Sequence, residues 1–289
     1  MARLQHSPVT DTGANCRKMS LAGMLENLNL NRKLSQKEYK RALPTLQRRL
    51  YDLERVCWQH GVPSAIVFEG WDAAGKGGAI SALTERLDPR GFRLHPINPP
   101  RTYELSRPWL WRFWLKIPAA GELAIFDRSW YFRVLDERVE RIVPEKIWRN
   151  AYRDIVEFER TLAADGAVIL KFFLHISKKE QKQRFEAIED DPLESWRVTK
   201  ADWERHKKYS KYLAATEEML ELTESDFAPW TIVEATSKWY ARSKIFETLI
   251  AALEMRLGRY APRREETEKD AAKDAELRDA MEELTGGHS

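Results

Sequence analysis

Residues 70–78 read GWDAAGKGG, a glycine-rich stretch with the spacing GxxxxGK. Glycines let the backbone curl so that successive N–H groups point inward, and the lysine supplies a mobile cation. Phosphate is the ligand that uses both features. We therefore predict a phosphate-binding loop whose residues are Gly70, Ala73, Ala74, Gly75, Lys76, Gly77 and Gly78.

The segments on either side support this prediction. The apolar run AIVF precedes the loop, and the helical pattern AISALTERL follows it, so the dipole of a helix N-terminus would add to the loop's attraction for anions. The loop departs from the common pattern in one respect. Gly77 stands where most such loops have a Ser or Thr that holds Mg²⁺, so metal binding must rely on carboxylates.

Two aspartates are the candidate metal ligands. Asp72 lies inside the loop, and Asp127 follows the apolar run LAIF, where a strand would end at the ligand-binding edge of an α/β sheet. Each also has a simpler interpretation: Asp72 could cap the following helix, and Asp127 could form a turn.

Basic residues follow the second aspartate, and guanidinium groups stabilise the charge that spreads over a transferring phosphoryl group. Most such residues lie on solvated helix faces, so we single out Arg128, Arg133 and Arg184 from a larger set. The others in that set are Arg138, Lys182, Arg197 and Lys200.

The 11 tryptophans are numerous for this length, and Trp109, Trp111 and Trp114 cluster in PWLWRFWLK. A nucleotide base could stack there, but core packing explains the spacing equally well. His175 and His206 have no partner at a catalytic spacing, and we assign them no chemistry.

Five short apolar segments alternate with helical patterns and would position these residues. They are 64–69, 92–97, 123–126, 168–174 and 231–233. This alternation predicts a parallel sheet with helices on both faces. A helix is expected from Ser35 to His60, bent or divided at Pro44, and the charged helical region 178–222, interrupted at Asp191-Pro192, is a candidate mobile lid.

The composition places few further limits. With 48 basic and 45 acidic residues the net charge is only +3, which argues against a nucleic-acid-binding protein. The two cysteines have no zinc-site spacing, and neither a signal peptide nor a membrane span is visible, so we expect a cytoplasmic protein without a membrane association. We predict an arm over 1–34, one domain over 35–258 and a charged tail, a solvated helix or frayed end, over 259–289.

Several motifs together resemble the polyphosphate kinase family 2, a group of P-loop phosphotransferases. The matching stretches are FEGWDAAGKGGAI (68–80), LDPRGF (87–92), FDRSWY (126–131), ERV (137–139), EFER (157–160), KEQKQRF (179–185), DPLESW (191–196) and APWTIVEA (228–235). They occur in order over most of residues 35 to 256.

The resemblance implies a three-layer α/β/α kinase-like fold with a five-stranded parallel sheet and a helical lid. It implies phosphoryl transfer between inorganic polyphosphate and an adenine or guanine nucleotide, with Mg²⁺, or alternatively Mn²⁺, as cofactor and a homo-oligomer, dimer or tetramer, as the assembly. Carried over by position, Lys76 would bind the transferring phosphate, and Asp72 and Asp127 the metal or the attacking oxygen. The active-site charge network would be Arg128, Arg133, Glu137 and Arg184.

The sequences of 90–116 and 228–249 look most like the branch that phosphorylates AMP to ADP, while transfer to ADP, and the reverse reaction, remain open. Two other functions are also open. One is an ATP-dependent nucleotide or small-molecule kinase, and the other is a P-loop protein that binds polyanions without turnover.

Overall fold

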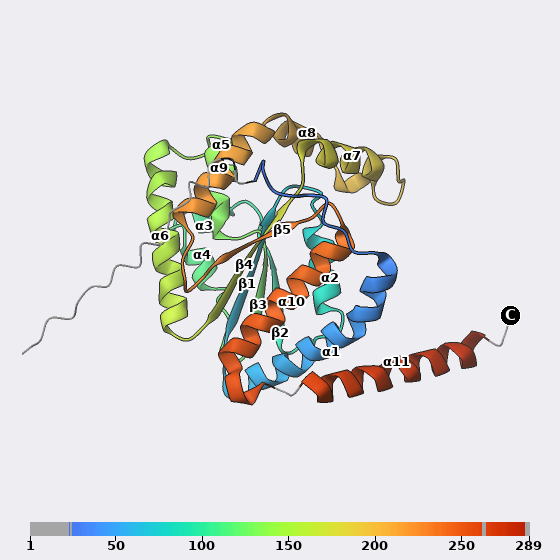
Figure 1. The fold of residues 1–289 in the computed structure, drawn as a ribbon. Coiled ribbons are helices and arrows are strands. Elements are labelled where there is room, and N and C mark those ends of the chain that lie inside the picture. The colour runs from blue at the N-terminus through green and yellow to red at the C-terminus, as the bar shows by residue number, and fades with distance from the viewer. Residues whose placement is uncertain (1–22, 24, 262–263, 287–289) are drawn as a thin grey trace, which may run out of the picture.

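The computed structural model describes residues 23, 25–261 and 264–286. A five-stranded sheet lies between two layers of helices (Figure 1). Its strands are β1 (Ser64–Gly70), β2 (Phe92–Pro96), β3 (Leu123–Asp127), β4 (Val168–His175) and β5 (Trp230–Glu234). They pair in the order β2-β3-β1-β4-β5, and every pair is parallel. The predicted three-layer α/β/α architecture is confirmed, and each predicted strand is present.

Burial explains why the strands have continuous apolar sequences. The central strands β1, β3 and β4 are buried along almost their whole length, whereas the edge strand β2 is largely exposed. Because all strands are parallel, their carboxyl ends share one edge of the sheet. That edge carries the phosphate-binding loop after β1 and Asp127 at the end of β3.

Helices cover both faces of the sheet. On one face lie α1 (Gln36–His60), α2 (Lys76–Thr84) and α10 (Lys238–Leu257), which contact one another (Figure 1). On the other lie α3 (Thr102–Leu105), α4 (Trp111–Trp114), α5 (Asp136–Val139) and α6 (Glu145–Ala164). Short 3₁₀ turns are η1 (Trp130–Arg133), η2 (Ser195–Arg197) and η3 (Gly258–Tyr260).

The segment predicted as a lid forms three helices: α7 (Lys178–Glu189), α8 (Lys200–Lys207) and α9 (Tyr209–Leu222). The predicted interruption is confirmed, because α7 ends just before Asp191-Pro192. Figure 1 shows α7 and α8 above the carboxyl edge of the sheet. Movement of this segment remains a prediction.

Pro44 does not divide the first helix, so that half of the prediction is wrong, while the alternative, a bend at Pro44, remains a prediction. α1 runs without interruption from Gln36 to His60, and a capping box of Ser35 and Glu38 starts it. A proline removes one intrahelical hydrogen bond and adds a steric clash. Burial of Leu50, Leu53 and Cys57 in the core outweighs that local cost.

The terminal segments differ in how far they are described. Most of the predicted arm, 1–34, lies outside the described residues, although Leu25 is buried and its N–H donates to the Glu217 carboxylate.

The tail forms the helix α11 (Arg264–Gly286), as one of the two predicted alternatives. One face of α11 is covered rather than solvated, because Thr267 and Ala271 are buried and Arg48 of α1 pairs with Asp270 at 3.0 Å. The domain boundaries remain a prediction.

Among the described residues, no helix is both long and apolar enough to cross a membrane.

A buried ion pair fixes the turn that follows β3. Lys171, in the middle of β4, is fully buried and pairs with Glu159 of α6 at 2.8 Å. The Glu159 carboxylate also accepts from Trp130 Nε1 at 2.9 Å and from the Tyr131 hydroxyl at 2.7 Å. Lys171 completes its bonds with the Thr223 carbonyl at 2.8 Å. The turn beside Asp127 is therefore held from beneath by a satisfied polar cluster.

We predict that Lys171→Met costs about 3–5 kcal/mol of unfolding free energy, because it leaves the Glu159 carboxylate buried without its counter-ion. The double variant Lys171→Met, Glu159→Leu should lose much less than the sum of the two single variants. Urea unfolding of the four proteins measures both quantities. Additive losses would contradict the coupling.

Candidate active site

The phosphate-binding loop connects β1 to α2, as predicted. At Gly70 the chain has φ +134°, and a Cβ there would lie 2.4 Å from the Leu174 carbonyl oxygen of β4. Only glycine fits that close approach of two backbones. Gly75, with φ +101°, then starts α2 without a side-chain cap. The first amides of α2 are therefore open to an anion.

Lys76 lies folded over the loop. Its ammonium group donates to the carbonyls of Gly70 at 2.7 Å and Trp71 at 3.1 Å. Burial lowers its pKa, and the neighbouring Arg128 charge lowers it further, while Asp72 and Asp127 oppose both effects. The cation is thus held at the mouth of the loop, within reach of a bound phosphate.

Asp72 is the centre of the charge network. Its carboxylate accepts from Arg128 Nη2 and from Arg205 Nε, each at 2.7 Å. Burial alone would raise the pKa of this carboxyl, but the charges of Arg128, Lys76 and Arg205 lower it to about 2. The interpretation of Asp72 as a helix cap is wrong, since both oxygens bind guanidinium groups.

Arg128 adopts a strained backbone conformation to reach Asp72. Its φ of +63° is rare for a residue with a side chain, and its Nη1 also lies 3.3 Å from the Asp136 carboxylate. Such strain persists where the surroundings impose it, and it is concentrated at functional sites. The Trp130 and Tyr131 turn supplies that constraint here.

Asp127 lies beside the loop, with its Cα paired in register with Phe68 of β1. The residue is half-buried, and the charge of its carboxylate raises the pKa of Lys76. The carboxylate forms no hydrogen bond or ion pair with any described residue. It is thus available for a ligand.

The carboxylates at this edge limit how a divalent metal could be held. The described residues contain no group of three or more His, Cys, Asp or Glu that could hold a metal ion alone. Mg²⁺ needs only one or two carboxylates when phosphate oxygens supply the remaining ligands. The available Asp127 carboxylate, with Asp72 nearby in the same charge network, fits that use.

Arg184 lies near the loop, and its predicted part in the active-site charge network remains a prediction. Its guanidinium donates to three backbone carbonyls, those of Ala73, Ala235 and Thr236, at 2.8–3.0 Å. It also pairs with Glu180 at 2.7 Å. Together with Gln181, whose amide donates to the Asp72 carbonyl, it ties α7 to the loop.

Arg133 and Glu137 lie in an adjoining cavity of about 180 Å³ rather than against the loop. They pair with each other at 2.9 Å, and the Arg133 guanidinium lies 5.1 Å from the centre of the Trp109 ring. Trp109 therefore faces a cavity, as the base-stacking alternative requires, whereas Trp114 packs edge-on against Phe158 at 4.8 Å.

A larger cavity of about 690 Å³ lies on the outer side of the loop. Ala74, Gly75 and Gly78 form one wall. The cations that line it are Arg184, Arg197, Lys238 and Arg242. A Cβ on Gly78 would lie 2.8 Å from Arg242 Nη2, so the glycine makes room for that guanidinium.

Sequence reasoning missed Arg205, Asp136 and Arg242. Arg205 sits in a run of basic residues on α8, DWERHKKY, and nothing in its spacing separates it from its neighbours. Arg242 joins the site only because α10 returns beside α2. Asp136 precedes the ERV motif directly, so attention to that motif's flank could have found it.

Glu69 lies beneath this edge and is fully buried. Its carboxylate accepts from the Ser129 hydroxyl at 2.7 Å. Burial raises its pKa to about 7, although the Ser129 hydrogen bond and the charges of Lys76 and Arg128 oppose that rise. The group is a titratable support for the turn that holds Arg128.

Comparison with known proteins gives consistent matches. The family model described as Polyphosphate kinase 2 (PPK2) matches residues 33–260. A polyphosphate:AMP phosphotransferase of Pseudomonas syringae pv. tomato is 42% identical over 82% of this chain, which spans only 47% of that relative. An AMP/ADP-polyphosphate phosphotransferase of Meiothermus ruber is 39% identical over 74% of this chain and 80% of its own length. The crystal structure of polyphosphate kinase 2 from Arthrobacter aurescens TC1 superposes with a TM-score of 0.78 at 30% identity, covering 85% of this chain and 92% of that one.

We predict that Glu69 makes stability fall as pH rises. Its folded pKa is above the unfolded value, so its stabilising contribution is complete below about pH 4.5 and is lost as the pH rises through about 7. Over that pH range the free energy of unfolding of the natural protein should fall by on the order of 1–3 kcal/mol relative to that of Glu69→Gln. The Gln variant does not titrate but keeps an acceptor for Ser129. Urea unfolding at several pH values measures the difference, and parallel pH profiles would contradict it.

Proposed function

The chain belongs to the polyphosphate kinase 2 family, and on that basis we propose that it transfers a phosphoryl group from inorganic polyphosphate to a nucleoside phosphate. The first relative is about twice as long as the segment matched, so this activity is proposed for the chain itself.

The observation that carries the proposal is the position of the loop between two cavities. On its outer side is the cavity of about 690 Å³ lined by Arg184, Arg197, Lys238 and Arg242. On its inner side a smaller cavity contains Asp72, Arg128, Asp136 and Arg205. A donor with many phosphates suits the larger cavity, whose lining has four basic residues against two acidic ones, and an acceptor phosphate suits the inner one.

In the proposed reaction, a phosphate oxygen of the nucleotide attacks the terminal phosphorus of polyphosphate. A new P–O bond forms as the bond to the bridging oxygen breaks, and the polyphosphate leaves one phosphate shorter. The nucleotide oxygen is already a competent nucleophile, so the site needs positioning and charge neutralisation more than a strong base.

Each charged residue then has a defined task. Lys76 and the first amides of α2 bind the transferring phosphoryl group. Arg128 and Arg205 stabilise the negative charge on its oxygens once they are released from Asp72. Asp127 and Asp72 would hold Mg²⁺, with Mn²⁺ as the alternative, and the ion would neutralise phosphate charge. Arg133 and Glu137, with Trp109, line the cavity proposed for the acceptor's nucleoside.

AMP is the proposed acceptor, and ADP the second candidate. Both relatives described above have AMP in their names, and the one from Meiothermus ruber, which this chain spans over most of its length, also has ADP. Two other functions, an ATP-dependent kinase and a non-catalytic polyanion-binding protein, predict different products in the following experiment.

We expect ADP to form from AMP when the protein is given Mg²⁺ and long-chain polyphosphate. Chromatography measures the ADP and ATP that are produced. ATP formed from ADP would support the second acceptor. Product with ATP as donor but none with polyphosphate would overturn the proposed donor. A folded protein that makes no product from any of these would indicate binding without turnover.

The roles of two residues can be tested separately. Lys76→Ala and Asp127→Asn should each reduce transfer by at least about 10²–10³-fold, because each removes a charge that faces the transferring phosphate. Lys207→Ala and Asp165→Asn, at exposed positions away from the loop, are the matched controls. Circular dichroism checks the fold. Near-normal turnover in either site variant would refute its assignment.

A further inference from the structure

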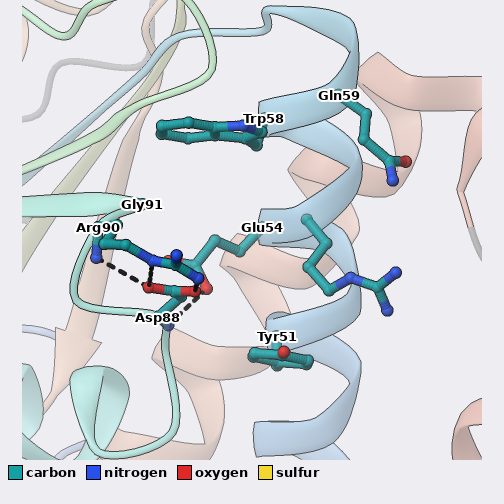
Figure 2. Close-up of a pocket in the computed structure, with 8 residues that line it drawn as sticks. Tyr51, Glu54, Trp58, Gln59, Asp88, Arg90 and Gly91 are labelled. Atoms are coloured by element: carbon teal, nitrogen blue, oxygen red, sulfur yellow. Dashed lines mark hydrogen bonds and ion pairs between the residues drawn. The ribbon is translucent and has the colours of Figure 1, made fainter.

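A separate cavity of about 300 Å³ lies at the opposite edge of the sheet. It is lined by residues of α1 and by the loop that leads into β2, that is, by Tyr51, Glu54, Arg55, Trp58, Gln59, Asp88, Arg90 and Gly91 (Figure 2). Gly91 directly precedes the amino end of β2, whereas the phosphate-binding loop follows the carboxyl end of β1. None of these residues belongs to the candidate active site, so the cavity needs its own explanation.

The floor of the cavity is an incompletely bonded carboxyl group. Glu54 is only 1% exposed, and its Oε2 accepts from the Asp88 N–H at 2.8 Å. Its Oε1 is buried and has no hydrogen-bond partner. Leaving such a polar atom unpaired is costly, and native structures rarely do so without a ligand or water.

Glycine at position 91 leaves the space beside this oxygen free of a side chain. A Cβ on Gly91 would lie 2.5 Å from Glu54 Oε1, so any side chain there would occupy the space above the carboxyl group. The φ of Gly91 is not in the left-handed range, so the glycine is needed for space and not for backbone conformation. The LDPRGF motif thus shapes the cavity.

The walls of the cavity are flat groups. Tyr51 and Trp58 lie seven residues apart on α1, about two turns, and Figure 2 shows their rings on either side of the Asp88–Arg90 pair. Asp88 holds the Arg90 guanidinium with two bonds, from Nε at 3.0 Å and from Nη2 at 2.7 Å. Trp58 is 59% exposed, so its indole is open to contact by a ligand.

The Trp58 indole and the Arg90 guanidinium are two of these flat groups. No cation–π contact joins Trp58 and Arg90 among the described residues, although both face the same cavity. A planar ring inserted between them would stack on the indole on one side and on the guanidinium on the other. Arg55, which is exposed and forms no ion pair with a described residue, adds a positive charge at the rim.

We propose that this cavity is a second ligand site for an aminopurine nucleotide, whose base stacks on Trp58 and whose exocyclic amino group donates to Glu54 Oε1. Arg55 and Arg90 provide the positive charge for the phosphate. Adenine and guanine nucleotides share the required amino group. Burial raises the pKa of Glu54 to about 7, helped by the Asp88 charge and opposed by the Asp88 N–H, and a carboxyl group retains a carbonyl acceptor in either protonation state.

The site is independent of the proposed phosphotransfer, because a nucleotide bound here lies at the other edge of the sheet from Lys76. Binding at this cavity would therefore persist in Lys76→Ala, whether or not the chain transfers phosphate. The active site and this cavity can be told apart by where a bound nucleotide reacts.

The test uses photo-labelling of the full chain with 8-azido-AMP and, separately, 8-azido-GMP, followed by peptide mapping. We expect label on peptides that contain residues 51–59 or 88–91, in the natural protein and in Lys76→Ala. Label from one analogue alone identifies the preferred base. Label absent from these peptides with both analogues, at about 1 mM, the weak end of specific binding, would overturn the proposal.

Variants show whether the named groups make the site. Trp58→Ala, at an exposed position, should weaken labelling here about tenfold or more, and Trp58→Phe should retain it because the ring still stacks. Glu54→Gln keeps an acceptor for the Asp88 N–H but places an NH₂ donor where Oε1 was, so labelling should also fall about tenfold. Circular dichroism confirms folding. Unchanged labelling in Trp58→Ala would refute the stacking role and the proposal with it.

Discussion

The Asp72 carboxylate connects three parts of the molecule. It belongs to the phosphate-binding loop, and its two oxygens bind Arg128 at the end of β3 and Arg205 on the helical segment above the sheet. A buried carboxylate is stable only with such partners, because desolvation alone would favour its neutral form. The Asp72 carboxylate therefore fixes the relative positions of three elements: the phosphate-binding loop, α8 and the turn that follows β3.

The same edge must also tolerate many cations close together. Lys76, Arg128 and Arg205 converge on it, and carboxylates balance them at short range. The geometry is maintained from below by buried, hydrogen-bonded groups. The Lys171–Glu159 pair holds the Trp130–Tyr131 turn, and the Glu69 carboxyl, whose pKa burial raises, accepts from Ser129. The Lys171–Glu159 pair adds no net charge beneath the site, so it does not reduce the site's attraction for anions.

Features set by local sequence could be predicted, and features set by docking could not. The loop at 70–78 and the strand-end Asp127 follow from glycine spacing and apolar runs, which act within a few residues. Arg205 and Arg242 reach the site because whole helices pack there, so their neighbours in sequence give no signal. Arg184 was correctly placed near the loop, but its donors are used by backbone carbonyls that only the folded chain brings together. Pro44 shows the opposite effect, in which burial of the helix face outweighs a strong local preference.

The contact between Asp72 and Arg205 makes the position of α8 sensitive to multiply charged anions that bind Arg205. Both side chains are about one-quarter exposed or less, so salt screens their attraction only partly, over a Debye length of about 8 Å at 0.15 M. A multiply charged anion that enters the site competes far better than chloride for the same guanidinium. The proposed donor would thus loosen this attachment of the segment above it as it binds, and a shortened or departing chain would allow Asp72 to recover its partner.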